Sequence, residues 1–326
     1  MAEPAVSAAL AIGELEQYRA ELSAFCYRML GSPFDAEDAV QDTFVRAWRS
    51  RYRFEGRAAM RSWLYRIGTN VCLDMIKGRE RRLLPMDLGP AREPLAEHLQ
   101  VRSEKTWIEP IPEQLLEAES DPADIAVAHE SIRLAFVAAL QYLPARQRAV
   151  LILRDVMCWE ASEVAKLLDA SVASVNSALQ RARTSIAKSN VSSADRAPSL
   201  GEVDRALLER YVAAFERYDF DALTSLIHED ATQSMPPYDM WLQGRDHIFA
   251  WWCGPGIECR DSRVIPTGKA NGSPAFGQYK PSPRSGFDPW ALQVLELSRG
   301  RIVELTFFLD TARLFPLFGL PSRLDA

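Results

Sequence analysis

The sequence predicts a multidomain fold, in which two all-α segments at 14–86 and 125–188 precede an α+β segment at 202–326. Apolar residues recur every three to four positions in the first two segments, whereas period-two runs typical of strands appear after residue 226. Two stretches rich in Pro, Ser and acids, 87–124 and 189–201, read as linkers. A chain of 326 residues with 48% hydrophobic and 25% charged residues is long enough for several globular cores.

Composition excludes several classes of protein. No apolar run approaches the roughly 20 residues of a membrane span, and the first residues lack the basic lead-in of a secretion signal. The five cysteines are scattered and odd in number, so we expect no disulfide framework and a cytoplasmic location.

The first segment reads as successive helices. Ser32-Pro33 is a helix start, followed by acids in the first turns, where the helix dipole favours them. Val40, Phe44, Val45 and Trp48 are expected to form the buried stripe of this helix. A second helix repeats the pattern with Trp63, Leu64, Ile67, Val71, Met75 and Ile76.

Charge is unevenly spread along the chain. From Arg46 to Arg82 there are eleven basic and three acidic residues, a net charge of +8, whereas 87–130 holds eleven acids and three basic residues, a net of −8. The whole-chain net charge of −6 therefore conceals a basic block beside an acidic one. This asymmetry indicates a phosphate-binding surface next to a tether.

Aromatic residues alternate with cations in the basic block. Phe54 and Trp63 lie among Arg57, Arg61 and Arg66, with Asn70 about one turn beyond. Flat rings and positive charge together suit single-stranded DNA. The alternative is that Phe54 and Trp63 are core residues beside a solvated arginine face, and for Trp63 a core position is favoured.

Residues 161–187 predict a helix-turn-helix. A short helix packs through Val164, Leu167 and Leu168, and Ser171 is placed to cap a second helix whose apolar stripe is Val172, Val175, Leu179 and Ala182. Small and amide side chains on the outer face reach base edges in a major groove, and arginines reach phosphates. From this segment alone a structural helical hairpin with a polar outside is an equal alternative. The outer-face candidates are Ser171, Ser174, Asn176, Ser177, Gln180, Arg181 and Arg183.

The third segment begins with a helix pair and ends in a hairpin with Arg299-Gly300 as its two-residue loop. No paired carboxylates at fixed spacing are found, and His247, Cys253 and Cys259 match no structural zinc pattern. We therefore predict no enzyme activity, no metal and no cofactor. The acid–base candidates are Asp219, His228, Asp246, His247 and Asp310.

Two stretches carry a family resemblance. MLGSPFDAEDAVQDTFVRAWRS with FEGRAAMRSWLYRIGTNVCLDMIKGRERR resembles domain 2 of the extracytoplasmic-function sigma factors of bacterial RNA polymerase. ALQYLPARQRAVLILRDVMCWEASEVAKLLDASVASVNSALQRAR resembles their domain 4. Residues 202–326 are similar, more loosely, to the SnoaL-like branch of the NTF2-like cone, a curved sheet wrapped by helices.

The resemblance implies site residues. Asp38, Gln41, Asp42 and Arg46 would face core RNA polymerase. The minus-thirty-five element would meet the outer-face candidates of 171–183, although many members carry basic residues where this chain has Asn176 and Ala178. The acidic linker would thread the polymerase cleft. The minus-ten strand and its phosphates would be handled by Phe54, Arg57, Arg61, Trp63, Arg66, Asn70, Lys77, Arg79, Arg81 and Arg82.

The function that follows is an alternative sigma factor that binds core polymerase, recognises both promoter elements and promotes melting, with a fused domain that modulates it. An anti-sigma protein or a small-molecule ligand of that domain is left open as a further partner. The alternatives are an NTF2-like enzyme tethered to a DNA-binding arm and a ligand-sensing helix-turn-helix repressor. The basic, aromatic block at 54–82 favours the sigma factor, because a repressor has no need to hold melted DNA.

Overall fold

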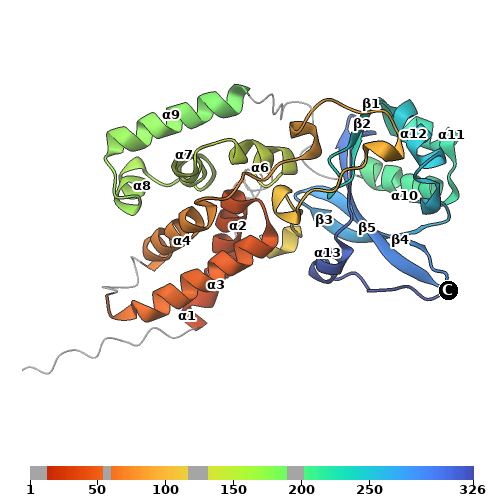
Figure 1. Ribbon diagram of the computed structural model, residues 1–326. Helices are drawn as coiled ribbons and strands as arrows, with labels where there is room; N and C mark the ends of the chain where they lie inside the picture. The colour runs from red at the N-terminus through yellow and green to blue at the C-terminus, as the bar shows by residue number, and fades with distance from the viewer. Residues whose placement is uncertain (1–12, 54–59, 117–130, 189–201) are drawn as a thin grey trace, which may run out of the picture. The chain divides into compact units, whose positions relative to one another are not determined.

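The computed structural model describes residues 13–53, 60–116, 131–188 and 202–326 (Figure 1). The chain divides into two compact units. The helical unit comprises 1–82 and 114–191, and the sheet unit comprises 83–113 and 192–326. Phe54 and Arg57 lie outside the described residues.

The helical unit begins with helices α1 (Gly13–Glu16), α2 (Arg19–Leu30), α3 (Pro33–Arg49) and α4 (Met60–Ile76), with a 3-10 turn at Arg51–Arg53. The predicted start of α3 is confirmed, because the Ser32 hydroxyl accepts a hydrogen bond from the Asp35 backbone N–H at 3.3 Å. Pro33 occupies the first turn, where its missing N–H costs nothing.

The buried face of α3 differs from the predicted stripe. Val40 is fully buried and Phe44 half-buried, but Val45 is 45% exposed and Trp48 is 37% exposed. Small side chains fill the interior instead, because α2 and α4 both pack against this helix. The buried positions of α3 are Pro33, Ala36, Ala39, Val40, Thr43 and Ala47.

In α4 the prediction holds for the centre of the stripe. Leu64 and Val71 are buried, whereas Trp63, Ile67, Met75 and Ile76 are half-buried. Tyr65 and Cys72 are also fully buried, so the interior face of α4 is rotated from the one predicted.

The second half of the helical unit contains α6 (Leu134–Gln141), α7 (Ala145–Leu151) continued by a π-helical turn (Ile152–Val156), α8 (Ala161–Leu167) and α9 (Val172–Lys188). The predicted break at Leu143-Pro144 separates α6 from α7. Val164, Leu167 and Leu168 are buried as predicted, and the Ser171 hydroxyl accepts from the Ser174 N–H at 3.1 Å.

One residue of the α9 stripe was predicted wrongly. Val175, Leu179 and Ala182 are buried, but Val172 is 44% exposed. Val172 is the first residue of α9, where the helix has just left the turn that contains Asp169 with a positive φ of 50°. Packing of α9 against α7 and α8 begins only one turn later, at Val175.

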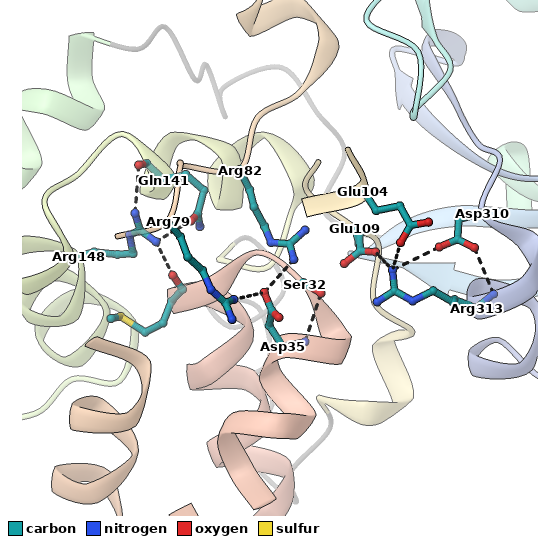
Figure 2. Close-up of polar contacts among 11 residues, drawn as sticks. Ser32, Asp35, Arg79, Arg82, Glu104, Glu109, Gln141, Arg148, Asp310 and Arg313 are labelled. Atoms are coloured by element: carbon teal, nitrogen blue, oxygen red, sulfur yellow. Dashed lines mark hydrogen bonds and ion pairs between the residues drawn. The ribbon is translucent and has the colours of Figure 1, made fainter. Parts of the chain in front are cut away.

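Buried arginines join the two halves of the helical unit (Figure 2). Arg148 of α7 is 4% exposed; it donates to the Met29 carbonyl at the end of α2 and, at 2.5 Å, to Oε1 of Gln141. Arg28 of α2 donates to the Ser131 hydroxyl at 2.8 Å. Burial lowers the pKa of both arginines to about 10. Because these cations satisfy backbone and hydroxyl acceptors across the two halves, they hold the halves as one body.

The sheet unit is built on six strands, β1 (Ile227–Ser234), β2 (Trp241–Gln243), β3 (Arg263–Ala270), β4 (Ser273–Pro281), β5 (Phe287–Ser298) and β6 (Arg301–Phe308). Their order is β2-β1-β6-β5-β4-β3, with β1 parallel to β6 and the other pairs antiparallel. The predicted hairpin is confirmed: Ser298 pairs with Arg301, and Arg299 and Gly300 have φ of 49° and 72°, as a type I′ turn requires.

Helices α10 (Glu202–Arg217), α11 (Phe220–Leu226) and α12 (Arg245–Cys253) pack against the sheet, and α13 (Thr311–Leu317) packs on β5 (Figure 1). Aromatic rings fill the core, where Phe215 meets Trp252 edge to face at 5.2 Å. Two buried polar groups are paired, Tyr211 with Gln293 at 3.0 Å and the Trp252 indole with Gln233 at 2.8 Å.

Residues 83–113 belong to the sheet unit, although the sequence places most of them in a linker. They form short 3-10 turns at Pro85–Asp87, Ala96–His98 and Glu104–Thr106. Two other 3-10 turns occur at Glu113–Leu115, where the segment ends, and at Ile257–Cys259 in the cone. Trp107 is 3% exposed and Ile108 fully buried. This segment, called the docked linker below, is therefore packed chain rather than a solvated tether.

Candidate nucleic-acid and polymerase interface

The polymerase-facing candidates lie together on the exposed side of α3. Asp38 and Gln41 are exposed, and Arg46 is bonded to both Asp42 at 2.9 Å and Asp74 at 3.1 Å. Since each residue of an α-helix turns the chain by about 100°, Asp38, Asp42 and Arg46 project on one side. Gln41 donates to Glu37 at 2.9 Å on the same side.

Sequence reasoning missed the apolar centre of this face. Val45 and Trp48, predicted to be buried, project between the charged groups of α3. The Arg51 guanidinium lies 4.4 Å from the centroid of the Trp48 ring. An exposed apolar centre with a charged rim is the usual composition of a protein–protein contact.

On α4 the strand-binding candidates divide between two faces. Trp63, Arg66 and Asn70 recur at helical spacing and share one face, on which Arg66 and Asn70 are exposed. Lys77 is also exposed and lies one residue beyond the end of α4. Arg61 projects on the opposite side, where it bonds Glu21 at 2.9 Å and lies 5.4 Å from the Trp159 ring. Arg61 precedes Trp63 by two residues, which is about 200° around the axis of an α-helix. This spacing could have shown from the sequence that the two side chains lie on different faces.

The three arginines that follow α4 have different surroundings, and Figure 2 shows two of them, Arg79 and Arg82. Arg79 is exposed and bonds the Asp35 carboxylate at 3.2 Å, whereas Arg82 is 8% exposed and bonds the same carboxylate at 2.8 Å. Arg81 is exposed and lies 4.3 Å from the Tyr142 ring. Arg82 is thus held inside the helical unit, while Arg79 and Arg81 face solvent.

The outer face of α9 contains most of the groove candidates. Ser171, Ser174, Asn176, Ser177, Gln180, Arg181 and Arg183 are all exposed. Ser174, Ser177, Gln180 and Arg181 lie opposite the buried Val175 and Leu179, and Arg181 donates to the Ser177 hydroxyl at 2.7 Å. Asn176 and Arg183 lie toward one flank, where Arg183 forms an ion pair with Asp155 at 2.6 Å.

Backbone hydrogen bonds fasten the docked linker to the cone. The Arg92 N–H donates to the Trp241 carbonyl at 2.9 Å, and the Arg102 N–H donates to that of Pro237 at 2.9 Å. Farther along, the Ile111 N–H donates to the Asn271 side chain at 3.0 Å, and the Asn271 N–H returns a bond to the Ile111 carbonyl at 3.1 Å.

Acids of the docked linker also pair with cations of the cone. Arg313 of α13 lies 2.9 Å from Glu109, 3.5 Å from Glu104 and 3.3 Å from Asp310 (Figure 2). Glu113 lies 3.6 Å from Lys269. In the opposite sense, Arg102 of the linker pairs with the buried Asp239 at 3.0 Å.

Three acid–base candidates of the cone have structural partners. Asp219 caps α11 by accepting from the Ala222 N–H, and Asp310 caps α13 by accepting from that of Arg313. His247 hydrogen-bonds the carbonyl of Gln243, the last residue of β2. Among the residues that the structure describes, no group of three His, Cys, Asp or Glu side chains is arranged to hold a metal ion.

Comparison with known proteins identifies the parts of the chain. Residues 15–82 match the family model for Sigma-70 region 2, residues 133–186 that for Sigma-70 region 4, and residues 208–305 that for a SnoaL-like domain. These matches fall inside the three predicted segments. Within the described part of the chain, no helix is long and apolar enough to cross a membrane.

Relatives extend over nearly the whole chain. It is 46% identical over 317 residues to the ECF RNA polymerase sigma factor SigG of Mycobacterium tuberculosis, covering 95% of this chain and 83% of the relative. It is 30% identical over 223 residues to SigJ of the same species, covering 68% of this chain and 63% of SigJ. The crystal structure of SigJ has the same fold, with a TM-score of 0.60 at 21% identity, covering 96% of this chain and all of that one. The chain therefore belongs to the ECF sigma factors of bacterial RNA polymerase.

Proposed function

We propose that this sigma factor binds core polymerase through the exposed face of α3, directs it to two promoter elements, and is controlled by the docking of its linker on the cone. The observation that supports the last part is the docked linker itself. Backbone bonds and ion pairs fasten residues 83–113 to the sheet unit. The protein would act where polymerase and promoter meet, in the cytoplasm.

Core binding would use the charged rim and apolar centre of α3. Reversing the charge at Asp38 and Asp42 together should weaken the affinity for core polymerase about tenfold or more, the effect of losing a few central contacts. The fold should survive, because Asp38 is exposed and Asp42 engages only an exposed ion pair. Val45→Ser should weaken core binding in the same way.

A matched control reverses two exposed acids of the sheet unit, Asp221 and Asp230. Binding to core polymerase, measured by fluorescence anisotropy alongside thermal unfolding of each variant, compares the two pairs. Equal affinity of both double variants would contradict the assignment of α3 as the core-binding face.

Promoter contact would divide between α4 and α9. The α4 face with Trp63, Arg66 and Asn70, followed by Lys77 just after the helix, suits an unstacked strand, because it combines a ring, an amide and cations. The outward face of α9 suits a major groove, because Ser177 and Gln180 are small or amide side chains that reach base edges. For Arg82 we propose a structural role in place of a phosphate contact, since it is buried against Asp35.

Regulation would operate through the linker that joins the two sigma regions. A linker fastened to the cone restricts how far apart regions 2 and 4 can move. Because linker and cone belong to one chain, their effective concentration is high, so even a weak contact between them is highly populated. The cone is proposed to act without catalysis, since Asp219 and Asp310 cap helices. Whether docking restrains or assists initiation depends on the linker path that polymerase requires.

Truncation after Ser193 tests this regulation, because it removes the cone and leaves both sigma regions with the linker. Run-off transcription with core polymerase should change, upward or downward, while core binding persists. Identical transcription by truncated and full-length protein would mean that the cone is not regulatory, and the enzyme alternative would gain.

A further inference from the structure

A cavity of about 360 Å³ lies between the docked linker and the cone, inside the sheet unit. One wall is the linker, with Glu104, Trp107 and Glu109. The other wall is the cone, with residues from the β1–β2 connection, the start of β5, the end of β6 and α13 with its cap, among them Tyr238, Trp290, Phe308 and Asp310. Its volume falls at the small end of ligand-binding cavities.

The lining combines aromatic rings with negative charge. Of the described residues that line the cavity, three are carboxylates, Glu104, Glu109 and Asp310, and none is a lysine or arginine. All three carboxylates share the single guanidinium of Arg313 at its edge, at 2.9 to 3.5 Å (Figure 2). Among the lining residues, acidic side chains therefore outnumber basic ones.

One cation of the cone lies against a lining ring and is itself paired. Lys280 lies 3.4 Å from the centroid of the Trp290 ring and pairs with Glu258 at 3.2 Å. Trp290 thus already accepts an ammonium group against one face, which shows that its surroundings favour cations at aromatic faces. An anionic ligand would meet three carboxylates without a lining cation, whereas an organic cation would meet both charge and rings.

We propose that this cavity binds a small organic cation with an aromatic or apolar body, and that binding holds the linker on the cone. The ligand would touch linker and cone together, so it would bind only the docked state and shift the population toward it. The binding site stands on the cavity alone, while its regulatory meaning rests on the function proposed above.

The test uses the full chain and matched probes of opposite charge. Tryptamine and phenethylamine are the cations; indole-3-acetate and phenylacetate are the anions of similar shape. We expect the amines to bind with a Kd of about 1 mM or tighter by calorimetry, as ligands of this size do. They should raise the Tm and slow amide hydrogen exchange in residues 101–113.

Two variants place the site. Glu109→Gln keeps a hydrogen-bond acceptor for Arg313 and should weaken amine binding about tenfold, the loss of one charge-assisted contact. Glu104→Gln is the safer variant for folding, because the Glu104 side chain is 65% exposed and 3.5 Å from Arg313. Glu97→Gln, in the exposed part of the same linker, is the control and should change nothing.

Three outcomes would overturn the site: neither amine binds, the anions bind as well as the amines, or both glutamine variants bind the amines like the unaltered protein. Amine binding without slower exchange in 101–113 would overturn the claim that the ligand holds the linker. These measurements need no polymerase. Their failure would therefore leave the truncation test of regulation by the cone intact.

Discussion

Replacing Trp107 by Ala should release the docked linker while leaving the cone folded. Trp107 is 3% exposed, and it lines one cavity together with Trp290 and Phe308 of the cone. Its backbone forms a β-bridge with Leu83 of the same segment. Truncating a buried tryptophan costs about 3–5 kcal/mol. At about 1.4 kcal/mol per factor of ten, the opening equilibrium of the linker should rise about a hundredfold to several thousandfold.

Amide hydrogen exchange of the full chain, followed by mass spectrometry, measures this opening directly. Peptides from 100–113 should exchange faster in Trp107→Ala, while peptides from the buried strand β5 keep their protection. Leu95→Ala is the control, because Leu95 is in the same segment but 46% exposed. Unchanged exchange in 100–113 would refute the docked linker, and faster exchange throughout the sheet unit would show that Trp107 is part of one cooperative core.

Three further outcomes are expected. Arg148→Met should lower the free energy of unfolding of the helical unit by about 2–4 kcal/mol, since it leaves several buried carbonyls without a donor. Urea denaturation measures this change, and an unchanged midpoint would contradict the role given to Arg148. Gln180→Ala should weaken binding to a minus-thirty-five duplex by about 1–3 kcal/mol at one base position. Arg183 pairs with Asp155, so Arg183→Ala should weaken binding less and without base preference. Equal losses in a binding titration would argue against this assignment of the α9 face. Burial raises the pKa of the Cys259 thiol to about 11, so at pH 8 this thiol stays protonated and iodoacetamide should label it more slowly than the exposed Cys158. Mass spectrometry follows the two labelling rates, which should converge as the pH rises toward 11. Equal labelling at pH 8 would contradict the protonated thiol.

Local signals in the sequence determined a large part of this protein. Ser32 and Ser171 start helices because their hydroxyls accept hydrogen bonds from backbone N–H groups three residues on. Arg299-Gly300 closes the β5–β6 hairpin because two consecutive residues accept positive φ. Such interactions span a few residues, so the residue types alone predict them, and the order of motifs along the chain then indicates the family.

The exposure and the partners of other side chains depend on tertiary packing, which a local sequence pattern does not determine. Val45 and Trp48 fit a helical stripe, yet they are exposed because α2 and α4 pack on the small residues of α3. The spacing of Arg61 from Trp63 already puts it on another face of α4, but only the folded structure brings Glu21 and Trp159 to that face.

The linker shows the same division most clearly. Its acids and prolines predict a solvated tether, because such a composition makes the segment costly to order by itself. Composition carries no information about a distant segment whose contacts could offset that cost. That segment is the cone, which presents Arg313, Lys269 and Asn271 to residues more than a hundred positions earlier in the chain. Contacts at such separation depend on the folded arrangement of both segments, and so only the tertiary structure assigns the linker to the cone.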